Sequence, residues 1–305
     1  MGPHRPGVSA VIWNADRSRR QGHIVDGLYR QAAGVPGERK AVLAGGLRGA
    51  DKAAALVKAG VDPARYLVIS VDAVLGELAR RSLIPVVAGL APLEGAELVH
   101  AEAQHVAKRL AARAIAAGTN VLLDVTAASW PSVRSWLHVA DLAAYTLDVV
   151  FAEVSEAEAV RWAGAEHDRG QEAYRRGRGD GGRPASPEAI RAAAPLAAET
   201  GQRPWARHIA HLNRRRAAAF PGGEVTGLVT AYRDGLLTLD GLARRLRDRP
   251  WPLVPPTCPP GAAAAAPAID DLEPWQPGSF DEVVLACDLG ILSDADYAAL
   301  AATIT

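Results

Sequence analysis

Cysteine, net charge and long apolar runs are all scarce in this sequence. Its two cysteines, Cys258 and Cys287, lie far apart without CxxC spacing. This excludes a disulfide framework and a cysteine zinc site, and it is typical of a reducing compartment. No apolar run approaches the roughly 20 residues that span a bilayer, and the N-terminal segment has no apolar core of signal-peptide length. We therefore expect a soluble, cytoplasmic protein without membrane contact.

The charges of the chain cancel, because Lys and Arg number 34 and Asp and Glu also number 34. A neutral chain has no overall field that draws it to nucleic acid. The basic run 214–216 could touch nucleic acid, but it lacks interleaved aromatics, and a solvated helix end is favoured. Hydrophobic residues make up 49% of 305 residues, enough for one large domain with appended pieces.

Predicted strands and helices alternate along the first half of the chain. Helical segments follow the predicted strands, and the longest covers 94–117 with Gly118 at its C-terminal end. Short apolar runs predict strands at 40–46, 66–72, 120–126 and 145–154. This spacing predicts an α/β fold of the P-loop kinase type, a parallel sheet with helices on both faces, followed by a small helical C-terminal extension.

Two short units near the C-terminus look like copies of each other. In 232–238 and 287–293 a glycine ends one helix and a Thr or Ser caps the next, which predicts two helical hairpins. The segment between the hairpins is rich in Pro and Ala, which is typical of a semi-rigid linker. The predicted units are a flexible leader (1–22), a kinase-like domain (23–220), a hairpin (221–249), a linker (250–279) and a second hairpin (280–305).

A segment rich in Arg and Gly, residues 166–184, interrupts the regular pattern and has no apolar face. It reads either as a solvated, mobile loop or, from its position, as an arginine lid of the kind that covers the phosphates in P-loop kinases. Both interpretations stay open on the residues alone.

The glycine-rich turn after the first predicted strand stands where a Walker A loop belongs. In GxxxxGK[ST], backbone N–H groups cradle phosphate, the lysine reaches the outer phosphates and the hydroxyl binds magnesium. Gly46 and Lys52 are in register with the first glycine and the lysine, whereas Asp51 replaces the second glycine and Ala53 the Ser or Thr. The candidate phosphate-binding residues are Gly46, Leu47, Arg48, Gly49, Ala50, Asp51, Lys52 and Ala53.

Both replacements oppose phosphate binding. A carboxylate about 4 Å from a phosphate is repelled by roughly 4 kcal/mol at an effective dielectric near 20, and Ala53 has no oxygen for a metal. Arg48 could offset part of the charge but cannot serve as a magnesium ligand. An ordinary strand–turn–helix explains the same residues.

An ordered set of motifs resembles the zeta-toxin family of P-loop kinases over about residues 23–195. The set comprises 41–46 with Lys52, 66–72, the helix around 100–103, 120–126 and the end of the lid at 182–187. The resemblance implies phosphoryl transfer from ATP or GTP, with Mg²⁺, to a UDP-linked amino sugar. It also implies the context of a toxin–antitoxin pair, with an antitoxin as partner.

The resemblance assigns roles to four residues at strand ends and in the loop. Asp72 matches the catalytic base, which accepts the proton of the sugar hydroxyl, and Lys52 matches the P-loop lysine. Asp124 would lie near the metal and Thr126 beside the substrate. The alternatives are a helix N-cap for Asp72, a first-turn surface lysine for Lys52 and strand-end caps for the other two.

Three further residues match the family in the helices and the lid. Glu102 resembles a substrate-contacting glutamate, with a solvated helix face as the alternative, and Arg161 and Arg183 match the two lid arginines that steady the moving phosphoryl group. Leu75 departs from the pattern where the family usually has a basic residue. No closing strand is recognisable after the lid, where 205–220 looks helical and basic.

Two functions follow from these residues. One is a zeta-toxin-like kinase weakened or inactivated by Asp51 and Ala53, and the other is a pseudokinase that serves as a binding module. The C-terminal hairpins are candidates for docking an antitoxin or another protein partner.

Overall fold

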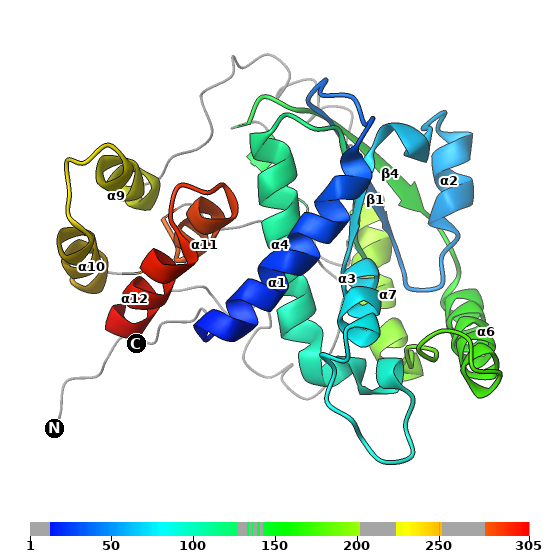
Figure 1. Ribbon diagram of the computed structural model, residues 1–305. Helices are drawn as coiled ribbons and strands as arrows, with labels where there is room; N and C mark the ends of the chain where they lie inside the picture. The colour runs from blue at the N-terminus through cyan, green and yellow to red at the C-terminus, as the bar shows by residue number, and fades with distance from the viewer. Residues whose placement is uncertain are drawn as a thin grey trace, which may run out of the picture.

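The computed structural model describes residues 13–126, 133, 136, 139–140, 143–201, 224–249, 251 and 278–304 (Figure 1). The predicted basic segment at 205–220 lies outside the described residues, as does almost all of the predicted linker. None of the helices in the described ranges is both long and apolar enough to cross a bilayer.

Four parallel strands form the sheet. In the order of the sheet they are β2 (Leu67–Ser70), β3 (Val121–Asp124), β1 (Lys40–Gly46) and β4 (Thr146–Ala152). β1 lies between β3 and β4, with Ala41 opposite Val121 on one side and Leu147 on the other. The parallel sheet confirms the predicted α/β fold, and it gathers the carboxyl ends of all four strands at one edge.

The two faces of the sheet are covered unequally. Helices α1 (Ala15–Tyr29), α3 (Val71–Arg80) and α4 (His100–Ala116) share the main core with one face (Figure 1). On the other face, the short helix α2 (Lys52–Lys58) contributes Leu56 to a smaller cluster. The short 3-10 helices are η1 (Arg30–Ala32), η2 (Pro63–Arg65) and η3 (Pro92–Val99).

Helix α1 begins within the segment predicted to be a flexible leader. The Asn14 side chain caps it by accepting a hydrogen bond from the Arg17 N–H at 2.9 Å, so the prediction of a flexible leader to residue 22 is wrong from residue 15 onward. Ser18 and Gln21 are buried on the same face as Ile24 and Val25. Because two of these buried positions are polar, the apolar periodicity of the helix is hidden in the sequence.

Two other boundaries differ from the prediction. β2 ends at Ser70, whose hydroxyl caps α3 by accepting from the Ala73 N–H, so Asp72 lies in the first turn of α3 and is not its N-cap. Helix α6 (Glu156–Arg175) extends through the first half of the segment 166–184, which is therefore helical there and not a mobile loop. There Glu and Arg residues four apart, such as Glu172 and Arg176, support the helix without an apolar face.

The C-terminal helices form a second core. They are α9 (Glu224–Arg233), α10 (Leu239–Arg247), α11 (Asp281–Asp288) and α12 (Asp294–Ile304). Gly235 and Gly290 both have positive φ, and the hydroxyls of Thr238 and Ser293 each accept an N–H of the following helix. The two predicted hairpin units therefore share the same turn chemistry. The division into domains and the docking of a partner on this region stay predictions.

A ladder of buried polar contacts joins α1, α4 and α11. Arg17 donates two hydrogen bonds of 2.7 Å to the Glu102 carboxylate. The Gln21 amide donates to Glu102 at 2.8 Å and accepts from Arg109 at 3.1 Å. Arg109 in turn donates to both carboxylate oxygens of Asp288, at 2.9 and 2.6 Å. The ladder fixes the C-terminal helices to the helical layer over the sheet.

Replacement of Asp288 by Ala tests this docking. The Asp288 side chain is 5% exposed, so its loss leaves the Arg109 guanidinium buried without a counter-charge. We expect the free energy of unfolding in urea to fall by about 3 kcal/mol. Asp26→Ala is the matched control, because Asp26 pairs with Arg113 at the surface and is 52% exposed; its loss should cost no more than about 1 kcal/mol. Equal, small losses from both substitutions contradict the docking role of the buried pair.

Candidate functional site

The turn between β1 and α2 passes close to neighbouring backbone at two glycines. Gly46 has a φ of 147°, and a Cβ at that position would lie 2.8 Å from the Ala152 carbonyl oxygen. Gly49 has a φ of 88°, and a Cβ there would collide with the carbonyl oxygen of Ala159 on α6. Only glycine fits at either point, so the turn between β1 and α2 is tight and packed closely against its neighbours.

The start of α2 carries an anion of its own. Asp51 is the N-cap of α2, and its carboxylate accepts a hydrogen bond from the Ala54 N–H at 2.9 Å. N–H groups at this end of a helix are the ones that receive phosphate in Walker A loops. The Asp51 side chain therefore takes a donor that a bound phosphate would use, and Ala53 next to it supplies no oxygen.

A cavity of about 440 Å³ opens beside this turn. Lys52, Asp72, Asp124 and Thr126 all line it, which brings together four of the residues assigned from the sequence. Its opposite wall is α6, which contributes Trp162, Glu166 and Arg169.

The lysine and the strand-end carboxylate of this cavity are paired. Lys52 Nζ lies 2.5 Å from Asp124 Oδ1. Asp124 ends β3, and Lys52 begins α2 after the neighbouring strand β1, so their proximity follows directly from the parallel sheet. The Lys52 side chain is therefore ion-paired within the protein.

Arg183 is the pivot of the site. Its side chain is only 5% exposed, and Nη1 donates to Asp72 Oδ1 at 2.8 Å, whereas the Asp72 side chain is 61% exposed. The surrounding protein partly displaces water from the Asp72 carboxyl, which raises its pKa, but the charges of Arg183, Arg48 and Lys52 and the Arg183 hydrogen bond more than offset this, so the pKa of Asp72 is lowered. Asp72 is thus an ionised carboxylate that is open to the cavity.

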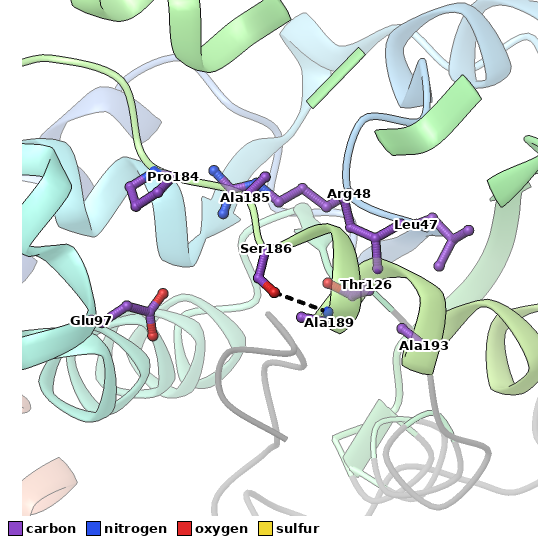
Figure 2. A pocket seen from close by; sticks show the side chains of 10 residues that line it. Leu47, Arg48, Glu97, Thr126, Pro184, Ala185, Ser186, Ala189 and Ala193 are labelled. Atoms are coloured by element: carbon purple, nitrogen blue, oxygen red, sulfur yellow. Dashed lines mark hydrogen bonds between the residues drawn. The ribbon is translucent and has the colours of Figure 1, made fainter. Parts of the chain in front are cut away.

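The other contacts of Arg183 lead to a second cavity of about 240 Å³ (Figure 2). Arg183 Nη2 lies 3.5 Å from Glu97 Oε1 and 3.2 Å from His100 Nδ1, and its carbonyl accepts from Arg48 at 3.3 Å. Glu97 lines the second cavity, whereas Arg48 and Thr126 line both cavities. Helix α7 (Pro187–Gly201) closes the second cavity with an apolar wall. The two cavities therefore adjoin along Arg48 and Thr126.

Two residues assigned from the sequence do not join this cluster. Arg161 lies on α6 outside the lining of both cavities, 67% exposed and 4.0 Å from Glu158. Glu102 is neither on a solvated helix face nor at a cavity, because its buried carboxylate is held by Arg17 and Gln21. Glu102 faces α1, and this contact could not be predicted because the start of α1 had been assigned to a flexible leader.

The sequence analysis assigned no role to Arg169, Glu97 or His100, of which Arg169 and Glu97 line the cavities and His100 contacts Arg183. Arg169 lies two helical turns after Arg161 on α6, and the continuous helix determines which arginine faces the cavity. Glu97 and His100 stand at the junction of η3 and α4, within the segment predicted as one long helix. The break at that junction turns both side chains toward Arg183, and no spacing in the sequence signals it.

The implied magnesium ion does not fit the residues in their family positions. Ala53 lacks the hydroxyl ligand, and the Asp124 carboxylate is paired with Lys52. Within the ranges that the structure describes, no group of three or more His, Cys, Asp or Glu side chains could hold a metal ion.

Comparison with known proteins gives one match. The family description zeta toxin matches residues 33–211, more than half of the chain. No curated protein and no solved structure matches the chain.

The close approach of the turn to α6 can be tested with Gly49→Ala. The added Cβ meets the Ala159 carbonyl and the backbone is held at positive φ, so we expect a loss of at least about 2 kcal/mol in the free energy of unfolding in urea. Gly177→Ala is the control, because Gly177 has a φ of 70° with no atom within 4 Å of a Cβ. It should lose only the backbone contribution, about 1 kcal/mol. Indistinguishable losses mean that the turn does not press against α6.

Proposed function

The chain belongs to the zeta toxin family, and from this premise we propose that it is a P-loop kinase-like phosphotransferase that acts on a UDP-linked amino sugar at a strongly reduced rate. The observation that carries the proposal is the convergence of Lys52, Asp72, Asp124 and Thr126 on one cavity, with Arg183 buried against Asp72. These residues come from four separate segments, and the sheet places them together.

In the proposed reaction Asp72 is the general base. Its ionised carboxylate takes the proton of the acceptor hydroxyl while that oxygen bonds to the terminal phosphorus of ATP or GTP. The bond between that phosphorus and the bridging oxygen breaks, and the nucleoside diphosphate leaves. Lys52, Arg169 and Arg183 border the path and would stabilise the charge on the transferred group.

The acceptor would occupy the second cavity. Glu97, Thr126 and the Ser186 hydroxyl provide polar groups against the apolar wall of α7 (Figure 2). An amino sugar presents hydroxyl and amide groups together with apolar ring faces, which suits such a lining. Because the two cavities adjoin, a hydroxyl of this acceptor can reach Asp72.

The reduced rate follows from the start of α2. The carboxylate of Asp51 repels the phosphates and occupies the Ala54 N–H, and Ala53 removes the metal-binding hydroxyl. Phosphoryl transfer depends almost entirely on positioning and electrostatic stabilisation, so both changes act on the dominant contributions to the rate.

Restoring the loop should therefore restore transfer. We expect the double variant Asp51→Gly with Ala53→Ser to raise kcat/KM by about 100-fold, measured as labelled γ-phosphate moved from ATP to UDP-N-acetylglucosamine with Mg²⁺ present. Asp62→Gly removes a similar cap from η2, away from both cavities, and should leave the rate unchanged. Addition of Asp72→Asn to the restored loop should abolish transfer. Transfer that survives Asp72→Asn, or no gain on restoration, contradicts the proposal.

A pseudokinase is the second candidate function, and the hydrogen bond from Ala54 to Asp51 favours it. If the turn is permanently capped by its own carboxylate, calorimetry with Mg·ATP should show binding by the restored double variant only. Micromolar binding by the unaltered protein contradicts a disarmed pocket and favours the kinase.

A further inference from the structure

Arg183 is buried and contacts different groups with its two terminal nitrogens. Nη1 is committed to Asp72 at 2.8 Å. Nη2 points to the junction of η3 and α4, where His100 Nδ1 is the nearer group at 3.2 Å and Glu97 Oε1 lies at 3.5 Å. The planar guanidinium therefore spans the gap between α3 and the start of α4.

We propose that His100 is a positioning residue that holds Arg183 in place across Asp72. This inference rests on the proposed function only for the role given to Asp72, since the contact itself is independent of any reaction. His100 is the first residue of α4, and the core contacts of α4 with α1 and α3 anchor it. The imidazole is thus a fixed acceptor against which Arg183 is set.

The chemistry of the two side chains determines the form of the imidazole. A guanidinium has only N–H donors, so Nδ1 must accept and the proton of the neutral ring must reside on Nε2. An imidazolium would place a second positive charge 3.2 Å from Arg183 Nη2 and would push the guanidinium away. In the part of the chain that the structure describes, the other charged groups that contact Arg183 are Asp72 from α3 and Glu97 from η3, both negative, and Arg48, which donates to the Arg183 carbonyl.

A displaced Arg183 would no longer hold Asp72. The carboxylate would lose a hydrogen bond and its strongest positive neighbour, and the base would gain freedom to turn. The state of Asp72 is therefore a direct reporter of the position of Arg183, whether or not the protein transfers phosphate.

The test is the titration of the Asp72 carboxyl carbon by NMR in the full chain without ligand. In His100→Ala we expect the pKa of Asp72 to rise by about half a unit or more. His100→Asn should keep the original titration, because its Oδ1 is as many bonds from the backbone as the histidine Nδ1. His100→Gln moves the acceptor one bond farther, so it should behave like the alanine variant.

His23→Asn on the exposed face of α1 is the matched control, and it should leave the Asp72 titration unchanged. Melting temperatures confirm that each variant is folded. If the His100→Ala variant does not fold, the titration in His100→Gln decides the outcome. An unchanged Asp72 titration in folded His100→Ala or His100→Gln overturns the proposal. Equal shifts in the asparagine and alanine variants also overturn it.

A second measurement separates this inference from the proposed function. On the background of the restored loop, His100→Ala should lower kcat about tenfold with little change in the KM for ATP, and His100→Asn should recover most of it. If no variant transfers phosphate, the proposed function fails, while the titration still decides whether His100 positions Arg183.

Discussion

The buried guanidinium of Arg183 is the contact on which the site depends. A charged group that is 5% exposed is costly unless it is paired, and the two terminal nitrogens of Arg183 contact Asp72, Glu97 and His100. Those partners come from α3, η3 and α4, so the pairing also fixes these three elements around the cavities. The most solvent-accessible of the three partners in this set, Asp72, is the one that would react.

The strands of the sheet could be predicted from the sequence because parallel strands covered by helices are buried on both faces and therefore appear as short apolar runs. β1 was predicted to the residue. The resemblance assigned Lys52, Asp124 and Thr126, and the parallel pairing of β1 with β3 brings them to the carboxyl end of the sheet. The prediction was weaker where burial is polar. Ser18, Gln21 and Glu102 are polar and give no apolar signal in the sequence. The predicted leader therefore extended past the start of α1, and Glu102 was assigned to substrate binding.

The side chains that face the cavity depend on helix phase and helix breaks. Arg161 and Arg169 are both arginines on α6, and only the angular position of each around the helix decides that Arg169 lines the cavity. The change from a 3-10 helix to an α-helix at His100 rotates Glu97 and His100 toward Arg183. A resemblance to a family identifies the segment that carries the functional side chains. The packing of that segment then determines which of its residues faces the cavity.

Several charged groups of the site are already paired within the protein, and this changes what ligand binding must accomplish. Lys52 is paired with Asp124, Asp51 with the helix terminus, and Asp72 with Arg183. A phosphate that enters the cavity has to replace these contacts, so its affinity is the difference between the new contacts and the old ones. Lys52 would exchange the Asp124 carboxylate for a phosphate, which changes the free energy little. Asp51 would lose the hydrogen bond from the Ala54 N–H and would repel the phosphate. In the proposed function the turn has the backbone geometry that a phosphate requires, but its charges oppose binding, and Asp51 contributes most to that opposition.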